Sequence, residues 1–319
     1  MKKIFLVFLV IFLSFFAGCQ YKNHQQKPIS DSTSFFAIRS SKNKWTNPLI
    51  DCEEYSTDYN VKINSMKQKV NDLVSDYSND LDEIAVYYRD LNNGPWFGLN
   101  EKNQFAPVSL LKVPVMIAYL KQAESDINLL NKKIMFNGKY SSDENIEEKD
   151  RLILGKEYTI DDLISRMITL SDNVAFGLLL DNIDSKYIKL VHEELDIPYP
   201  NQSTPQDYIT VKAYAGLFRI LYNATYLSRE MSERGLEYLN KSNFNLGIKE
   251  GLPKNIPTAL KFGYREKQAN DSVQFHDCGI IYFPKKPYLL CIMSKGKDRD
   301  RLVEVVGKIS KTIYYSLSQ

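Results

Sequence analysis

The chain has 319 residues, with 41 lysines and arginines against 39 aspartates and glutamates, for a formal net charge of +2. This balance excludes a nucleic-acid binder that works through bulk positive charge, because phosphate contacts need a clear excess of Lys and Arg. With 44% hydrophobic and 25% charged residues, the chain is also not intrinsically disordered, and it is long enough to bury a substantial core.

The N-terminus carries both surplus lysines, Lys2 and Lys3, and residues 1–18 contain no acid, so the remainder is balanced at 39 against 39. Ile4 to Phe16 is an apolar run interrupted only by Ser14. The run is too short for a transmembrane helix, which needs about 20 residues, but it is typical of a signal peptide. We predict a signal peptide over residues 1–18.

The predicted signal peptide ends in Phe16-Ala17-Gly18-Cys19, which resembles a bacterial lipobox. In such a motif the cysteine is lipidated and becomes the new N-terminus. Phe16 departs from the usual Leu, and an ordinary signal peptide with an incidental cysteine is the alternative. We favour a lipoprotein anchored at Cys19 to a membrane outside the cytoplasm.

A polar segment without periodicity follows over residues 19–57, and we interpret it as a tether between the membrane and the folded domain. Its few apolar residues, Trp45, Leu49 and Ile50, are candidates for local docking.

The next elements alternate between helix and strand. Apolar residues recur every three or four positions from Ile63 to Tyr77, which predicts an amphipathic helix. Glu83 to Leu91 and Trp96 to Leu99 predict a hairpin of two strands around Asn92-Asn93-Gly94. A helix that is apolar nearly all round, and therefore buried, is predicted from Ser109 to Leu120.

The second half of the chain is helical before it returns to strands. Thr159 to Asp162 is typical of a helix N-terminus, and that helix should stop at Ser171-Asp172-Asn173. Further helices are predicted to about residue 240. The last elements are predicted to be three strands and a helix: Thr258–Tyr264, Cys278–Phe283, Tyr288–Met293 and 302–317.

This order favours an α+β fold, with an antiparallel five-stranded sheet, terminal helices on one of its faces and an inserted all-α lobe.

Three cysteines remain after Cys19, namely Cys52, Cys278 and Cys291. A hairpin that turns at Pro284 to Pro287 would place Cys278 and Cys291 on one face of the sheet but diagonal to each other. No disulfide is therefore predicted.

The first chemical motif is Ser109-Leu110-Leu111-Lys112. A serine hydroxyl needs a base to become a nucleophile, and residues three apart on a helix share a face. A buried lysine has a lowered pKa and can be that base. Ser41 to Lys44 and Ser294 to Lys297 have the same spacing, but only the first motif opens a helix that is predicted to be buried.

Two further motifs follow in the chain. Ser171-Asp172-Asn173 offers a hydroxyl that can relay a proton and an amide that can bind a substrate amide or the lysine. Lys261-Phe262-Gly263 offers a positive charge on a predicted strand, and a glycine that allows close backbone approach. Each motif alone has an ordinary structural explanation, and Lys249-Glu250-Gly251 shows that Lys-x-Gly also occurs in a predicted turn.

Together and in this order, the motifs resemble those of the penicillin-recognising serine hydrolases, and Ser-Asp-Asn points to the class A β-lactamase-like branch. Phe105 to Pro114 and Tyr158 to Leu180 resemble the family's segments around its first two motifs. The resemblance covers about residues 60–319 and implies a β-lactamase/D,D-peptidase-like domain over 58–319.

The resemblance implies a role in acyl transfer for several residues. Ser109 would be the acylated nucleophile, Lys112 its base or proton shuttle, and Ser171 the donor of a proton to the leaving nitrogen. The backbone N–H groups of Ser109 and Tyr264 would form the oxyanion hole, which stabilises the tetrahedral intermediate.

The resemblance also implies substrate contacts. Asn173 would bind the amide on the acyl side and Lys261 a carboxylate, while Gly263 would let the backbone approach the substrate.

The third motif departs from the family at Phe262, where the family has a threonine whose hydroxyl helps to hold the substrate carboxylate. Phe262 removes that donor and adds bulk, which predicts weaker binding of ordinary β-lactams. Arg265 and His276 are possible substitutes for the hydroxyl, although a surface arginine and a histidine at the edge of the core are the simpler interpretations.

The second departure concerns deacylation. Class A β-lactamases carry an Ω-loop glutamate that activates water, but no Glu-x-x-Leu-Asn pattern occurs between Asn173 and Thr204-Pro205. We interpret the nearby acids as solvated or capping residues: Asp181, Asp184, Glu193, Glu194, Asp196 and Asp207. Without a positioned base, hydrolysis of the acyl-enzyme should be slow.

We therefore expect an extracytoplasmic serine hydrolase of the penicillin-binding or D,D-peptidase type, acting on β-lactams or D-Ala-D-Ala-like peptides. The alternatives are a true β-lactamase with a rebuilt deacylation site, and a non-catalytic binding lipoprotein on the same fold.

No cofactor or metal is predicted, since the three histidines, His24, His192 and His276, lack ligand spacing and no Gly-rich phosphate loop occurs. We expect a monomer that binds no nucleic acid.

Overall fold

Five antiparallel strands form the central sheet of the computed structural model, in the order β2-β1-β9-β8-β7. They are β1 (Leu81–Asp90), β2 (Trp96–Leu99), β7 (Thr258–Arg265), β8 (Val273–Ile281) and β9 (Tyr288–Gly296). The structure describes residues 43–47, 57–92, 94–141, 146–201, 203–266 and 272–318. The predicted α+β architecture is confirmed, and β7, which carries the Lys-x-Gly motif, is an edge strand.

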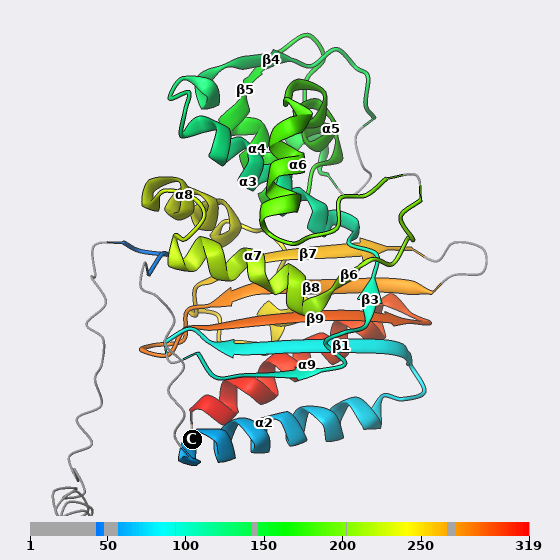
Figure 1. The fold of residues 1–319 in the computed structure, drawn as a ribbon. Coiled ribbons are helices and arrows are strands. Elements are labelled where there is room, and N and C mark those ends of the chain that lie inside the picture. Colours follow the sequence, from blue (N-terminus) through cyan, green and yellow to red (C-terminus); the bar gives the residue numbers. More distant parts are fainter. Residues whose placement is uncertain are drawn as a thin grey trace, which may run out of the picture. The chain divides into compact units, whose positions relative to one another are not determined.

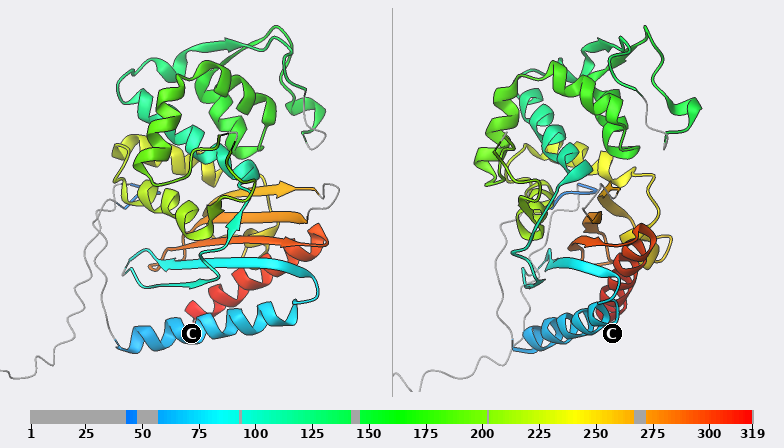
Figure 2. Two further views of the ribbon diagram at one scale, coloured as in Figure 1. Left: turned by 45° about the vertical axis from the view of Figure 1, so that its right-hand side comes forward. Right: turned by 90° about the vertical axis from the view of Figure 1, so that its right-hand side faces the viewer.

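The two terminal helices cover one face of the sheet, as predicted. They are α2 (Thr57–Asp76) and α9 (Arg299–Leu317), and Figures 1 and 2 show both on the side of the sheet opposite α7. Met66 and Val70 of α2 and Ile309 of α9 pack in one buried cluster with Val86 and Ile292 of the sheet. Alternate strand residues point to this face because side chains alternate along a strand.

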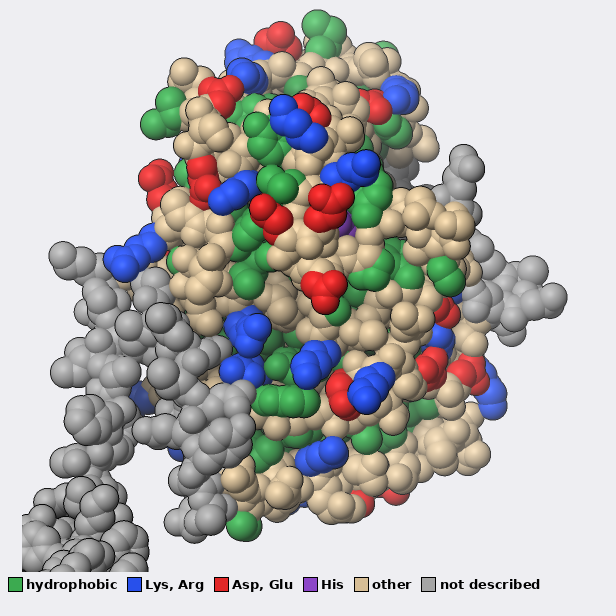
Figure 3. Space-filling model, in the orientation of Figure 1, with side chains coloured by type: hydrophobic (Ala, Val, Ile, Leu, Met, Phe, Trp, Pro, Cys, Tyr) green, Lys and Arg blue, Asp and Glu red, His purple; other side chains and the backbone are tan. Residues whose placement is uncertain are grey.

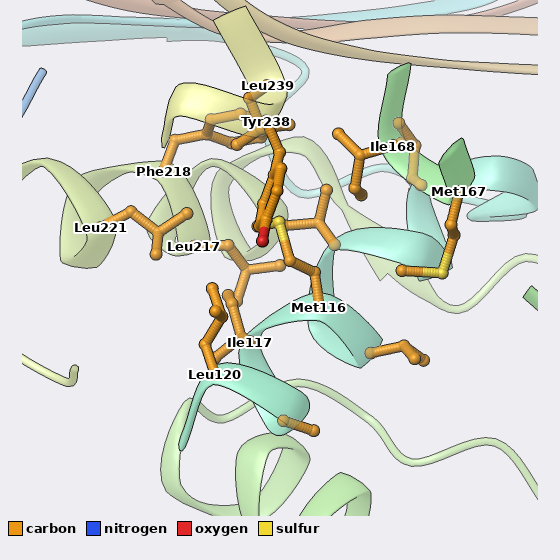
Figure 4. Packing of buried hydrophobic residues seen from close by; sticks show 14 of the residues in the cluster. Met116, Ile117, Leu120, Met167, Ile168, Leu217, Phe218, Leu221, Tyr238 and Leu239 are labelled. Atoms are coloured by element: carbon orange, nitrogen blue, oxygen red, sulfur yellow. The ribbon is translucent and has the colours of Figure 1, made fainter. Parts of the chain in front are cut away.

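The inserted helices form a lobe that packs against the opposite face. Its α-helices are α3 (Lys112–Ala123), α4 (Ile160–Thr169), α5 (Asn173–Asn182), α6 (Ser185–Glu194), α7 (Val211–Asn223) and α8 (Arg229–Asn240). Helix α3 is buried nearly all round, as predicted. Figure 4 shows Met116, Ile117 and Leu120 of α3 among side chains of α7 and α8, including Phe218 and Tyr238.

The structure also contains short elements that were not predicted. Two pairs of small strands occur, β3 (Gln104–Phe105) with β6 (Ile209–Thr210) and β4 (Lys133–Met135) with β5 (Glu157–Thr159). The single-turn 3-10 helices are η1 (Val108–Leu111), η2 (Leu129–Asn131), η3 (Glu148–Asp150) and η4 (Gly247–Gly251). Paired strands of only two or three residues are too short to give a period-two pattern in the sequence.

A disulfide joins Cys278 to Cys291, so the prediction of no disulfide is wrong. The two residues lie directly opposite each other in the β8–β9 ladder. The hairpin turns earlier than predicted: the Lys286 N–H donates to the Phe283 carbonyl, and Lys285 adopts a left-handed φ of 63°. This turn shifts the register by two residues, which keeps both cysteines on one face and brings them into direct opposition.

Part of the predicted tether docks on the domain. The Glu233 carboxylate accepts hydrogen bonds from the backbone N–H groups of Lys44, Trp45 and Thr46 at 2.7–2.8 Å. The Trp45 ring is buried and meets Tyr282 edge to face at 5.0 Å between ring centroids. Docking of Trp45 is therefore confirmed.

The predicted signal peptide, Cys19, Leu49 and Ile50 lie outside the described residues. Within the described part of the chain, no helix is both long and apolar enough to cross a membrane. On the face shown in Figure 3, basic and acidic side chains of the helical lobe are interspersed.

Candidate active site

Ser109 lies in the tight turn η1, directly before α3. The predicted helix therefore begins with a 3-10 turn, and its α-helical part starts at Lys112. Val108 has a φ of 49°, a left-handed conformation that is costly for a β-branched residue. Such a conformation persists only where the surroundings enforce it, and it is common at functional sites.

Two side chains of β8 hold the segment before Ser109. Gln274 Oε1 accepts from the Ala106 N–H at 3.1 Å, and His276 Nε2 lies 2.9 Å from the Ala106 carbonyl oxygen. Because the Ser294 N–H donates to His276 Nδ1 at 3.2 Å, the ring proton must lie on Nε2 and point to Ala106. Burial lowers the pKa of His276 to about 4, so the ring is neutral. His276 thus supports the segment that leads to Ser109 and does not substitute for the missing threonine hydroxyl.

The side-chain nitrogen of Lys112 is the centre of the site. Its Nζ lies 3.1 Å from Ser109 Oγ, 3.1 Å from Ser171 Oγ, 2.7 Å from the Ser171 carbonyl and 2.6 Å from Asn173 Oδ1. The side chain is only 2% exposed. Two of the predicted motifs therefore meet at one nitrogen, as their resemblance implies.

Lys261 reaches the same place from the opposite side. Its Nζ lies 3.0 Å from Ser171 Oγ and 2.9 Å from the Phe262 carbonyl oxygen. The side chain is fully buried. Burial, followed by the charge of Lys112, lowers the pKa of Lys261 well below its usual range, against the opposing effect of Asp277.

Ser171 is held in place by its neighbours. It has a left-handed φ of 57°. The next residue, Asp172, caps α5 by accepting from the N–H groups of Val174 and Ala175 at 2.9 and 3.1 Å. The other oxygen of Asp172 forms an ion pair with Arg166 at 3.1 Å. This pair, in which Asp172 is buried and Arg166 is partly exposed, helps to fix the loop so that Ser171 and Asn173 both contact Lys112.

Gly263 brings β7 close to the nucleophile turn. A Cβ atom built on Gly263 would lie 3.2 Å from Leu110 Cγ and 3.3 Å from the Pro107 carbonyl oxygen. Most side chains would force the two segments apart at these distances. The glycine therefore lets Tyr264, the next residue of β7, line the same pocket as Ser109.

The pocket at Ser109 has a volume of about 480 Å³. Of the predicted site residues, Ser109, Ser171, Asn173 and Tyr264 line it, whereas Lys112 and Lys261 lie behind its wall. Phe262 also lines it. Sequence reasoning missed much of the remaining lining, which comprises Ile146, Glu147, Asp150, Thr169, Leu170, Asn243, Phe244, Glu266, Phe275 and Arg299.

The acidic stretch before the second motif contributes to this pocket. The Arg166 guanidinium donates to the Asp150 carbonyl oxygen while it pairs with Asp172, so η3 is tied to the second motif. Residues 142–145 of the same stretch lie outside the described residues. The prediction of a solvated loop over 141–150 missed this link, although Arg166 and Asp172 are close enough in the sequence to suggest a pair.

Four of the acids after the second motif have structural partners. Asp207 pairs with Lys295 at 2.7 Å and accepts from Gln274 at 3.0 Å. Asp184 caps α6, Asp181 pairs with Lys139, and Glu194 accepts from Tyr226. None of these acids lines the pocket at Ser109.

The other segments that match the Ser-x-x-Lys and Lys-x-Gly patterns do not form comparable sites in the described part of the chain. Ser294 is buried and donates to the Phe275 carbonyl, while Lys297 Nζ donates to the Asn79 carbonyl. Lys249-Glu250-Gly251 lies in the turn η4, as predicted. Among the residues that the structure places, no three His, Cys, Asp or Glu side chains are arranged to hold a metal ion.

A family model described as the beta-lactamase enzyme family matches residues 65–317. The chain belongs to this family. The β-lactamase from Chitinophaga pinensis has a similar structure, with a TM-score of 0.70, 20% identity, and coverage of 79% of this chain and 99% of that one.

Two further solved structures share this fold. A class A β-lactamase from Bacteroides cellulosilyticus has a TM-score of 0.70 at 15% identity and covers 80% of this chain and 98% of its own. PBP-A has a TM-score of 0.67 at 18% identity and covers 85% of this chain and 99% of its own. A search of curated proteins gave no match.

Proposed function

We propose that this member of the beta-lactamase family is a serine hydrolase that forms an acyl-enzyme on Ser109 and releases it slowly. The observation that supports the proposal most directly is the convergence on Lys112 Nζ of Ser109 Oγ, Ser171 Oγ and Asn173 Oδ1, all within 3.1 Å. A nucleophile, a base and a proton relay are the groups that acyl transfer requires.

The hydrogen-bond inventory of Lys112 suggests how it acts as the base. The Ser171 carbonyl and Asn173 Oδ1 can only accept, and they are its two shortest partners, at 2.7 and 2.6 Å. A neutral amine would give one N–H to each and keep its lone pair for the Ser109 hydroxyl. The proton of Ser109 would then move to Lys112 as Oγ attacks the substrate carbonyl.

The remaining steps use Ser171 and the backbone. As the tetrahedral intermediate collapses, the bond to the leaving atom breaks, and the proton would pass from Lys112 through Ser171 to that atom. The N–H groups of Ser109 and Tyr264 would stabilise the oxyanion, as the resemblance implies. Lys261 would keep the Ser171 hydroxyl oriented through its 3.0 Å contact.

Slow deacylation is proposed because, among the described residues from Asn173 to Asp207, no acid lines the pocket at Ser109. A separate cleft beside Pro107 and Val108 is lined by Arg265 and by uncharged residues of 200–208, among them Asn201, Thr204, Gln206 and Tyr208. The one acid within residues 200–208, Asp207, is engaged with Lys295. Water would then attack the acyl-enzyme without a positioned general base.

The substrate class is proposed by analogy with relatives of the same fold. One solved neighbour is an acyl-enzyme complex of a PBP-A mutant with penicillin G. A β-lactam or a D-Ala-D-Ala-like peptide would present a carbonyl that Ser109 can attack. A labelled-penicillin gel of the wild type and Ser109→Ala tests this: labelling that depends on Ser109 supports the proposal. No labelling and no turnover of β-lactams or D-Ala esters would overturn it.

A true β-lactamase is the second candidate, because Glu147, Asp150 and Glu266 line the same pocket as Ser109. Any of them could serve as a rebuilt deacylation base if it reaches a water. Nitrocefin kinetics separate the two functions. A burst of one equivalent followed by slow turnover supports the penicillin-binding function, whereas fast steady turnover supports the β-lactamase.

The localisation is also a proposal: we infer an exported protein that is lipid-anchored at Cys19. The Cys278–Cys291 disulfide supports export, because structural disulfides are rare in the reducing cytosol. Membrane fractionation of the wild type and Cys19→Ala tests the anchor. Loss of the variant from the membrane fraction is expected, and equal fractions would contradict it.

A further inference from the structure

The β7 side of the Ser109 pocket is aromatic. The rings of Phe244 and Phe262 stack with centroids 3.9 Å apart and planes at 17°, and Phe275 lies 5.9 Å from Phe244. All three line the pocket. Phe244 and Phe262 are half-buried, so the pair presents part of its apolar surface to a ligand. We call Phe244 and Phe262 the phenylalanine pair.

The positive charge that the third motif was expected to supply, that of Lys261, does not reach the pocket. Lys261 is 0% exposed and does not belong to the pocket lining. Its Nζ already contacts Ser171 Oγ and the Phe262 carbonyl, and it lies 4.3 Å from the centroid of the Phe262 ring. Phe262 thus occupies the position at which the family's threonine would offer a hydroxyl to the pocket.

The charges on the pocket wall do not compensate. Among the residues that the structure describes, three carboxylates, of Glu147, Asp150 and Glu266, line the pocket against one guanidinium, that of Arg299. The Arg299 guanidinium lies over the Tyr264 ring at 5.0 Å, at an exposed position where water screens its charge. An anionic group on the Phe262 side would therefore lose hydration without gaining a buried partner.

We propose that the β7 side of the pocket accepts a flat, uncharged apolar group, which packs on the phenylalanine pair, in preference to a carboxylate. This inference rests on the proposed acyl-enzyme chemistry and narrows its substrate. The favoured acyl donors are esters or amides whose leaving group carries an aromatic ring. Carboxylate-bearing donors, including β-lactams and D-Ala peptides, react with Ser109 more slowly.

Aromatic packing is the physical reason for this preference. A phenyl group that leaves water for the phenylalanine pair gains both apolar burial and ring–ring contact. A carboxylate in the same place would lie against ring faces, which carry negative electrostatic potential. The Phe262 ring therefore favours the neutral group and disfavours the anion.

Two esters that differ in one group test the inference with the full-length protein. Both carry a phenylacetylglycyl acyl part; the leaving alcohol is lactate in one and 1-phenylethanol in the other. A phenyl ring thus replaces the carboxylate. The measured quantity is the rate of acylation of Ser109, divided by the alkaline hydrolysis rate of each ester. In the wild type, the phenylethyl ester should acylate at least about tenfold faster.

The reciprocal variant is Phe262→Thr, which restores a hydroxyl and removes the ring. It should lower the phenylethyl-to-lactyl ratio by about tenfold or more, and Phe244→Leu should lower it in the same direction. Tyr315→Thr removes an exposed aromatic ring of α9 outside the pocket and should leave the ratio unchanged.

The outcomes separate the inference from the function on which it rests. If Ser109 is acylated but the lactyl ester is preferred, or if Phe262→Thr and Phe244→Leu leave the ratio unchanged, the inference is overturned and the acyl-enzyme function stands. If neither ester acylates Ser109, the function fails, and the inference fails with it.

Discussion

Lys112 and Lys261 contact the same hydroxyl oxygen, Ser171 Oγ, at 3.1 and 3.0 Å. Two buried amines around one oxygen are electrostatically unfavourable if both are charged, and the charge of Lys112 contributes to the lowered pKa of Lys261. The arrangement favours the loss of a proton from one of the amines, which is what a serine nucleophile needs from its base.

Replacing Lys261 should separate function from stability. In Lys261→Met, a buried amine becomes an apolar side chain, so we expect the free energy of unfolding at pH 7 to rise by about 1 kcal/mol or more. Acylation of Ser109 should slow by about 100-fold, because Ser171 loses one of its two orienting contacts. Thermal unfolding and stopped-flow acylation measure the two effects.

Lys254→Met is the matched control, since Lys254 is exposed and lies outside the pocket. It should change neither quantity. A Lys261→Met protein that is clearly less stable than the wild type would show that the buried amine stabilises the fold.

The left-handed backbone of Ser171 predicts a difference between two variants that lack its hydroxyl. Ser171→Gly and Ser171→Ala both remove the proton relay, so both should acylate slowly. Only glycine relaxes a φ of 57°, so Ser171→Gly should be more stable than Ser171→Ala by about 1 kcal/mol. Chemical denaturation measures the difference, and equal stabilities would contradict local strain at this residue.

Much of the fold was predictable because apolar periodicity is a local property. The hairpin of β1 and β2, the buried helix at Met116 and the amphipathic helix α9 follow from spacing alone. The β8–β9 register was not predictable in the same way. It depends on the turn at Lys285, which adopts a left-handed φ. A lysine gives no indication of this conformation in the sequence, as a glycine would.

The site was predicted in part for a similar reason. Ser109, Lys112, Ser171 and Asn173 belong to short motifs, and the structure brings them together. The phenylalanine pair could not be predicted, because Phe244 lies outside every motif and meets Phe262 only through the tertiary fold. The support of Ala106 by Gln274 and His276 depends likewise on strand packing over long sequence distances.

A buried carboxylate on β8 predicts a pH-dependent stability. Burial raises the pKa of Asp277 from 3.8 to about 7, although the Ile248 N–H and the charge of Lys261 oppose the shift. The folded state therefore holds a proton that the unfolded state releases. The resulting stabilisation is complete below pH 3.8 and is lost as the pH rises through 7.

Asp277→Asn mimics the protonated form at every pH. The variant should match the wild type near pH 4 and become more stable than it as the pH rises to about 7, with no further change above. The pKa of His276 is shifted in the opposite direction, but His276 is present in both proteins and cancels in the comparison. A stability difference that does not depend on pH would contradict the raised pKa of Asp277.

The disulfide should contribute measurably to stability. It closes a loop with a sequence separation of 13, for which loop entropy gives roughly 3 kcal/mol. The double variant Cys278→Ala/Cys291→Ala should lose about that amount in urea denaturation. Peptide mapping of the denatured, alkylated and unreduced wild type should recover Cys278 and Cys291 on two linked peptides, and alkylated Cys278 and Cys291 would contradict the pairing.

The most direct test of the account is the mass of the intact protein after incubation with an excess of penicillin G or the phenylethyl ester. We predict one acyl group per chain, on the peptide that contains Ser109, absent from Ser109→Ala and still present long after the free acyl donor is removed. No adduct with either compound, or an equal adduct on Ser109→Ala, would contradict the proposal that Ser109 is the nucleophile of a slowly released acyl-enzyme.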